Sequence, residues 1–245
     1  MLYQPTIALP LQKDRTPMAD YVIPPPAIVS VPVEGGGGFP VRRVFCVGRN
    51  YAEHAREMGS DPDREPPFFF MKPADALLTG GADMPYPPQC KDLHHEMELV
   101  VAIAEGGENI AEADALRHVW GYAAGLDMTR RDLQNAAKKE GKPWDMGKGF
   151  DHSAPIGLMV PASRIGHPDK GLIELKVNGK VRQTSVLEKM IWNVPETIAY
   201  LSGLVRLAPG DLIFTGTPEG VAAVQRGDLL EGVVAGVGTV RTRIV

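Results

Sequence analysis

The chain has 245 residues, of which 44% are apolar, so it can form one large core or one domain with a small appendage. Its net charge of −4, without any basic run, argues against nucleic acid or an anionic membrane as a partner. No apolar run in the sequence approaches the roughly 20 residues that span a bilayer. The two cysteines do not make a disulfide framework, and reduced thiols indicate a cytoplasmic protein.

Glycine and proline are frequent, with 27 and 22 residues, which favours short strands joined by many turns over long helices. Residues 1–17 have the composition of an unstructured extension ahead of Met18. Residues 21–33 are rich in proline, are expected to be extended, and lead into a glycine hinge over 35–38. The sequence therefore predicts an N-terminal extension over 1–40 and one domain over 41–245.

Hydrophobic periodicity predicts the elements of that domain in order. The expected strands cover 41–47, 68–71, 96–103, 119–128, 156–160, 172–177, 211–215 and a closing hairpin within 233–245. The expected helices cover 51–58, 110–118, 130–139 and 194–204, and residues 144–151 are expected to form a loop. Asn178-Gly179, between two apolar segments, predicts a tight hairpin turn.

The segment Glu96-Met97-Glu98-Leu99 carries two carboxylates at the start of an apolar strand. Because strand side chains alternate between faces, Glu96 and Glu98 point to one side, and Met97 and Leu99 to the other. Two carboxylates on one face repel each other unless a cation lies between them. The pair therefore favours a metal site, although the solvated face of an edge strand has the same pattern.

Asp127 ends the next buried strand and is the candidate third ligand. A set of oxygen ligands favours a hard cation such as Mg²⁺ or Mn²⁺ over Zn²⁺. The neighbouring His94 and His95 are possible further ligands, or ordinary packed or exposed turn residues.

A second candidate group is the pair His54 and Glu57, three residues apart on the short helix expected over 51–58. A histidine held by a carboxylate can act as a general base near neutral pH. An exposed helix with an incidental His–Glu pair would look the same in the sequence.

Polar and cationic side chains form a third group, which could bind a carboxylate or an enolate oxygen: Lys72, Arg131, Gln134 and Lys148. Taken alone, each of them is more readily explained as a surface residue. The turn Thr215-Gly216-Thr217-Pro218 follows a strand and could offer backbone N–H groups to an anion. It lacks the G-K-[ST] ending of a phosphate-binding loop.

These segments, taken together and in order from residue 41 onward, resemble the fumarylacetoacetate hydrolase family. The resemblance rests on Cys46–Tyr51 with His54 and Glu57, Phe70–Pro73, Glu96–Leu99, Gly121–Asp127, Arg131–Gln134, Gly147–Asp151 and Thr215–Gly220. It implies an α+β fold that is mostly β, a mixed β-roll or sandwich with short peripheral helices, and a homodimer.

The resemblance also implies roles for individual residues. Glu96, Glu98 and Asp127 match three carboxylates that hold Mg²⁺ or Mn²⁺. His54 and Glu57 match a dyad that activates water on a short lid helix. The remaining matches are to groups that bind a 2-oxo acid substrate: Lys148, Arg131, Gln134 and Thr217.

The implied activity is metal-dependent hydrolysis of a carbon–carbon bond in an acylpyruvate, as in aromatic catabolism. Within the family, segment 68–76 and the proline-rich lead most resemble the members that cleave 3-fumarylpyruvate, and this resemblance implies fumarate and pyruvate as the products. Arg49 and Lys72 are the candidates for its far carboxylate. Oxaloacetate decarboxylation and isomerisation or decarboxylation of a 2-oxo-dienoate remain alternatives, because they need the same metal site but depend less on the dyad. A non-catalytic binder of oxalate-like acids would not need the dyad.

Overall fold

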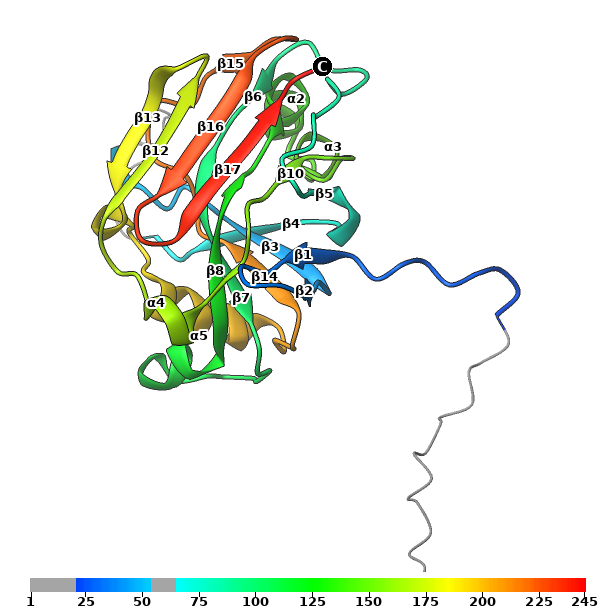
Figure 1. Ribbon diagram of the computed structural model, residues 1–245. Coiled ribbons are helices and arrows are strands. Elements are labelled where there is room, and N and C mark those ends of the chain that lie inside the picture. The colour runs from blue at the N-terminus through cyan, green and yellow to red at the C-terminus, as the bar shows by residue number, and fades with distance from the viewer. Residues whose placement is uncertain (1–20, 54–64) are drawn as a thin grey trace, which may run out of the picture.

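The structure, a computed structural model, describes residues 21–53 and 65–245, and strands dominate it (Figure 1). Its largest sheet has the order β11–β8–β7–β14–β3–β4, in which only β14 and β3 are parallel among the pairs. The strands are β11 (Val160–Pro161), β8 (Val119–Leu126), β7 (Met97–Ile103), β14 (Asp211–Phe214), β3 (Arg43–Gly48) and β4 (Phe68–Lys72).

Strand β7 lies near the middle of this sheet, and all of its residues are buried. Its apolar side chains alternate between two cores, as the sequence predicts. One core contains Met97, Leu99, Val101 and Ile103, and the other contains Val100 and Ala102. Glu98 therefore projects from the face of Val100 and Ala102, within a strand that is covered on both sides.

A four-stranded antiparallel sheet packs against β7 and β8 and encloses the larger core. Its order is β13 (Lys180–Val186), β12 (Leu172–Val177), β16 (Leu229–Val234) and β17 (Gly238–Arg243). Asn178 and Gly179 join β12 to β13 with φ of 52° and 75°. A two-residue turn with positive φ at both positions matches the twist of the strands, so the predicted hairpin is confirmed.

Segments that connect the strands of these two sheets form three smaller sheets. The most important for the site has the order β15 (Ala223–Val224), β6 (Leu93–His94), β9 (Thr129–Arg130), because β6 precedes β7 and β9 follows β8. The others pair β1 (Ser30–Pro32) with β2 (Gly38–Pro40), and β10 (Ala154–Pro155) with β5 (Leu77–Leu78).

The helices are short and lie at the two ends of the body (Figure 1). They are α2 (Arg131–Glu140), α3 (Asp145–Lys148), α4 (Ala162–Ile165) and α5 (Val194–Leu204), with 3-10 turns η1 (Ala74–Ala76), η2 (Glu112–His118) and η3 (Leu187–Lys189). Helix α5 begins where predicted, because Asn193 and Glu196 each accept the other's backbone N–H at 3.0 Å in a capping box. No helix in the described part of the chain is long and apolar enough to cross a membrane.

The structure corrects three of the predicted elements. Segment 68–71 is not a buried strand: β4 forms the edge of the large sheet, and Phe68 and Met71 are partly exposed. The loop expected over 144–151 contains α3, and the strand expected over 156–160 is reduced to β10 and β11 on either side. Strand β4 keeps a full ladder with β3 but lies at the sheet edge, and most of the apolar residues over 156–160 are buried without forming one continuous strand.

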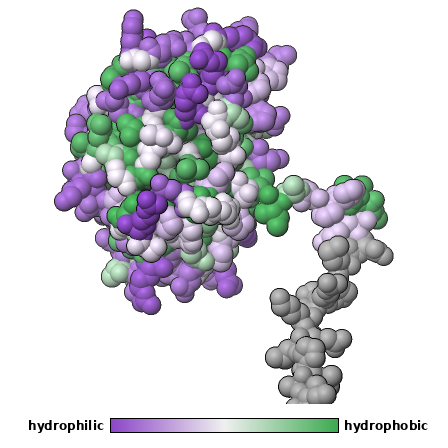
Figure 2. Space-filling view, in the orientation of Figure 1, coloured by the Kyte–Doolittle hydropathy of each residue, from purple (hydrophilic) through white to green (hydrophobic). Residues whose placement is uncertain are grey.

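The segment before β1 leaves the body and carries apolar side chains that are exposed, among them Val22 and Ile28 (Figures 1 and 2). Residues from 30 onward behave differently, since Val31 and Phe39 are buried in the second core. The predicted division of the chain at residue 40 stays a prediction, and β1 and β2 pack with the large sheet.

Candidate active site

Three buried carboxylates meet where β7 begins and β8 ends. Glu96 directly precedes β7, Glu98 lies on it, and Asp127 directly follows β8. The antiparallel register sets Met97 opposite Leu126, and the Asp127 N–H donates to the Glu96 carbonyl at 2.8 Å. As a result, one oxygen from each carboxylate lies within 4.8 Å of the others.

Burial and mutual repulsion make this cluster electrostatically costly by itself. Glu98 is almost fully buried, and burial, followed by the charges of Asp127 and Glu96, raises its carboxyl pKa well above the ordinary value. Glu98 Oε2 accepts the Gly216 N–H at 2.7 Å. The described residues include no lysine or arginine in ion-pair contact with Glu98. The solvated-edge interpretation of Glu96 and Glu98 is therefore wrong.

The other two carboxylates have cationic partners. Lys148 Nζ lies 2.7 Å from Glu96 Oε2 and 2.8 Å from Asp127 Oδ2, and these charges raise the Lys148 pKa although its burial lowers it. Arg131 Nη2 donates to Glu96 Oε1 at 2.5 Å. Lysine and arginine charges thus balance the carboxylates of Glu96 and Asp127, but among the described residues none forms an ion pair with Glu98. A buried set of oxygen ligands in which one carboxylate has no cationic partner fits a hard divalent cation.

Lys72 contacts Asp127 and lies outside the lining of the pocket beside the carboxylates. Its ammonium is 2.9 Å from Asp127 Oδ1, donates to the Met128 carbonyl at 3.0 Å, and also donates to the Lys148 carbonyl. Its side chain is fully buried and does not line the pocket beside the carboxylates. These contacts favour a role in supporting Asp127, so Lys72 is withdrawn as the partner of the far carboxylate.

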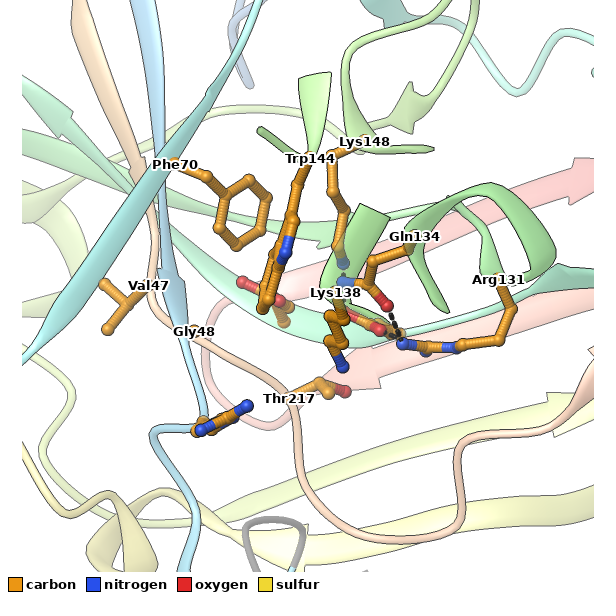
Figure 3. Close-up of a pocket in the computed structure, with 12 residues that line it drawn as sticks. Val47, Gly48, Phe70, Arg131, Gln134, Lys138, Trp144, Lys148 and Thr217 are labelled. Carbon is orange, nitrogen blue, oxygen red and sulfur yellow. Dashed lines mark hydrogen bonds and ion pairs between the residues drawn. The ribbon is translucent and has the colours of Figure 1, made fainter. Parts of the chain in front are cut away.

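A pocket is lined in part by Glu96 and Glu98, and Figure 3 shows side chains from several elements converging on it. It brings together five of the residues predicted to act on the substrate: Arg49, Arg131, Gln134, Lys148 and Thr217. Arg131 Nη1 donates to Gln134 Oε1 at 2.6 Å, which fixes both side chains on one face of α2. His54 and Glu57 lie outside the described residues, so their predicted roles stay predictions.

Phe70, Trp144 and Lys138 also line the pocket, and the sequence does not predict them as site residues. The two aromatic rings lie side by side with their centroids 6.1 Å apart, and Lys138 Nζ is 4.9 Å from the Trp144 ring. Helical spacing could have identified Lys138, because it follows Gln134 by four residues and Arg131 by seven.

Lys138 is the cation of the pocket whose charge is most easily lost. Partial burial, followed by the nearby charges of Arg131 and Arg49, lowers the pKa of its ammonium to about 8. An anion bound beside Lys138 would offset this repulsion. Arg49 adopts a positive φ of 59°, which is uncommon for a residue with a side chain and is frequent at functional sites.

The glycine turn after β14 supports the carboxylates as well as the pocket. Gly216 has a φ of +93°, and a Cβ there would lie 2.6 Å from the Cβ of Asn50, so the turn requires glycine. Its N–H binds Glu98, which differs from the prediction that it is offered to an external anion. The histidines also bind elsewhere: His94 Nε2 pairs with Asp92, and His95 Nδ1 with Gln183, each at 2.9 Å.

The fold and this site together define the class of protein. The model of the fumarylacetoacetate (FAA) hydrolase C-terminal family matches residues 43–245, so the chain belongs to that family and is an enzyme. The sequence resemblance and the predicted fold class are thereby confirmed.

Three relatives illustrate the range within the family. The chain superimposes on the fumarylpyruvate hydrolase of Pseudomonas aeruginosa, solved with Mn²⁺ and pyruvate, with a TM-score of 0.91 and 53% identity, covering 92% of this chain and 99% of that one. It is 46% identical to a fumarylpyruvate hydrolase of Ralstonia over 75% of this chain and 96% of the relative. It is also 43% identical to the mitochondrial oxaloacetate tautomerase of Rattus norvegicus, over 83% and 91%.

Proposed function

We propose that this enzyme is a divalent-metal-dependent acylpyruvate hydrolase whose substrate is 3-fumarylpyruvate. The observation that carries the proposal is the buried triad of Glu96, Glu98 and Asp127, of which Glu96 and Glu98 line a pocket that also contains hydrogen-bond donors. The similarity to two fumarylpyruvate hydrolases, one of them holding Mn²⁺ and pyruvate, supports the same choice.

The pocket suits the 2-oxo acid end of such a substrate. A bound divalent cation would act as a Lewis acid toward the 2-oxo acid oxygens. Arg131, Gln134 and Thr217 line the same pocket and carry the donors for the carboxylate. The Arg131–Gln134 bond holds these two side chains in place before the substrate arrives, which lowers the entropic cost of orienting it.

The reaction adds water across the bond between the methylene carbon and the distal acyl carbon. The water oxygen attacks the acyl carbonyl carbon, the carbon–carbon bond breaks, and its electron pair passes to the pyruvate enolate. A proton then returns to the methylene carbon, which leaves pyruvate and fumarate. The buried ammonium of Lys148 stabilises the negative charge that develops on the enolate oxygen.

Removing the proton from water requires a base, and His54 with Glu57 stays our proposal for it on sequence grounds. A histidine of ordinary pKa, about 6.5, is suited to this step near neutral pH. The carboxylate of Glu57 would fix the histidine tautomer and stabilise the imidazolium that forms.

The far carboxylate of fumarylpyruvate needs cations at the other end of the pocket. Arg49 and Lys138 supply them, with Lys138 replacing Lys72 in this role. The Trp144 ring lies beside Lys138 and offers an apolar surface to the flat, unsaturated chain between the two ends of the substrate. The arrangement favours a dicarboxylate over an acylpyruvate that ends in a methyl group.

Replacing Lys138 by methionine is expected to reduce kcat/KM for fumarylpyruvate by about 10- to 100-fold, the range for losing one charge-assisted hydrogen bond. Activity toward acetylpyruvate, which has no far carboxylate, is expected to stay within about threefold. Steady-state kinetics on both substrates test this. The matched control is Lys139→Met, since Lys139 is exposed on the same helix and does not line the pocket. Equal losses on both substrates would contradict the assignment.

The low pKa of Lys138 gives a separate prediction for pH dependence. Below about 8 the ammonium is charged and binds the far carboxylate, and above it the charge is lost. We therefore expect kcat/KM for fumarylpyruvate to fall as pH rises through about 8, and expect no such fall for acetylpyruvate. Lys138→Arg should abolish the fall, because a guanidinium stays protonated. A fall that persists in this variant would assign it to another group.

Oxaloacetate tautomerisation is the second candidate function, favoured by the 43% identity to the tautomerase. Oxaloacetate also presents a 2-oxo acid, but it is shorter and would not reach as far along the pocket. Comparing initial rates on fumarylpyruvate, acetylpyruvate and oxaloacetate with the Mn²⁺-loaded enzyme tests the choice. Our proposal requires fumarylpyruvate to have the highest kcat/KM, and it fails if only oxaloacetate is converted.

Assembly and location are further parts of the proposal. We expect a homodimer in the cytoplasm, as the family resemblance and the two free cysteines indicate. Light scattering coupled to size-exclusion chromatography would measure the subunit number, and a monomer would contradict the expectation.

A further inference from the structure

Gln183 connects the four-stranded sheet to the pocket through a buried amide. It lies on β13, is 1% exposed, and belongs to neither the carboxylates nor the pocket lining. Its Oε1 is 3.0 Å from Met97 N and 2.9 Å from His95 Nδ1. Its Nε2 is 2.8 Å from both Thr217 Oγ1 and the Pro218 carbonyl oxygen.

The partners of Gln183 leave only one orientation for its amide. The backbone N–H of Met97 can only donate, so the atom facing it is the amide oxygen. The carbonyl of Pro218 can only accept, so the atom facing it is the amide nitrogen. The orientation is therefore fixed by backbone groups at both ends and does not depend on any titrating residue.

This orientation of the Gln183 amide determines where the proton of the Thr217 hydroxyl points. Since Gln183 Nε2 donates to Thr217 Oγ1, that oxygen acts as the acceptor, and its own proton points away from Gln183. Thr217 lines the pocket, and Figure 3 shows it below Lys138, another lining residue. The Thr217 hydroxyl can therefore donate its proton into the pocket. A carboxylate, which only accepts hydrogen bonds, requires such a donor.

We propose that Gln183 is a positioning residue that holds the Thr217 hydroxyl as a hydrogen-bond donor for the substrate carboxylate. The inference deepens the proposed function and depends on the role of Thr217 in it. We expect Gln183 to affect substrate binding and not the chemical step. The carboxylate that accepts from Thr217 carries its charge both before and during the reaction, so the hydrogen bond stabilises the bound substrate and the transition state alike.

Gln183→Glu is the informative variant because it keeps the size of the side chain. One carboxylate oxygen can still accept from Met97 N and His95 Nδ1, but the other can only accept, so the Thr217 proton turns to it and away from the pocket. We expect KM for acylpyruvates and the Kd of oxalate to rise about 10- to 100-fold, with kcat changed by less than about threefold. Steady-state kinetics and calorimetry of oxalate with Mn²⁺-loaded enzyme measure these quantities.

The control is a double-mutant cycle with Thr217→Val. In that background the hydroxyl is already absent, so adding Gln183→Glu should cause no further loss of oxalate affinity. Thr217→Ser, which keeps the hydroxyl, should bind oxalate almost as the wild type does. If Gln183→Glu fails to fold, Gln183→Met replaces it in the experiment. Its oxalate affinity is expected to fall by about 3- to 10-fold, because the Thr217 hydroxyl can then rotate freely.

The outcomes separate this inference from the proposed function. Weaker binding in Thr217→Val together with unchanged binding in Gln183→Glu would overturn the role of Gln183 alone. A loss in Gln183→Glu that persists undiminished in the Thr217→Val background would also overturn it, since Gln183 would then act through the fold. Unchanged oxalate binding in Thr217→Val itself would instead remove Thr217 from the proposed site.

Discussion

Glu98→Gln is expected to weaken Mn²⁺ binding by more than about 100-fold, because losing a residue that only supports a ligand already costs about 10- to 100-fold. The enzyme should lose fumarylpyruvate cleavage to the same extent at limiting metal. The reason is that Glu98 is the triad member without a lysine or arginine partner among the described residues, so its charge is the one most available to a metal. Calorimetric titration with Mn²⁺ measures the affinity.

The same variant has a second readout that does not depend on activity. Removing one charge from a buried cluster of three carboxylates should leave the melting temperature of the metal-free protein unchanged or higher, while the rise caused by added Mn²⁺ disappears. Glu231→Gln is the matched control, since this carboxylate is about half exposed on β16 and should change neither quantity. Wild-type metal affinity in Glu98→Gln would contradict the assignment of the triad.

His54→Ala is expected to separate the proposed acylpyruvate hydrolysis from any conversion of oxaloacetate. General-base catalysis contributes typically about 10²- to 10⁴-fold, so acylpyruvate hydrolysis should fall by that amount. Oxaloacetate decarboxylation and tautomerisation need no activated water and should fall much less. Assays of each reaction with one preparation of the Mn²⁺-loaded variant measure the two effects.

His118→Ala is a suitable control for that experiment, because His118 lies on η2 and its ring bonds the Glu105 carbonyl away from the pocket. It should keep both activities. If His54→Ala hydrolyses fumarylpyruvate at the wild-type rate, the dyad is not the base. The assignment of His54 and Glu57 would then have to be replaced.

The sequence predicts the central strand well, and the reason is physical. The almost continuous apolar run of Met97–Ile103 follows from burial on both faces of the strand, and such a run can be recognised in the sequence directly. The hairpin at Asn178-Gly179 and the start of α5 are equally local, since each depends on adjacent residues alone. The pattern Glu96-x-Glu98 was ambiguous because an edge strand and a central strand give the same spacing.

The parts that the sequence could not predict depend on contacts between distant segments. The sequence predicts that Lys72 binds the substrate, and only the fold shows that its ammonium contacts Asp127 instead. Gln183 is 34 positions from Thr217 and 88 from His95, so no local pattern identifies it. Lys138 could have been predicted from the sequence, because helical spacing places it on the same face as Gln134.

The most direct test of the account is a Mn²⁺ titration of chelator-treated enzyme, with fumarate and pyruvate quantified as products from fumarylpyruvate. We expect no cleavage without metal and a rate that rises with added Mn²⁺ until about one ion is bound per chain. Undiminished cleavage in the chelated enzyme would contradict this expectation, as would saturation with Mn²⁺ without formation of fumarate and pyruvate.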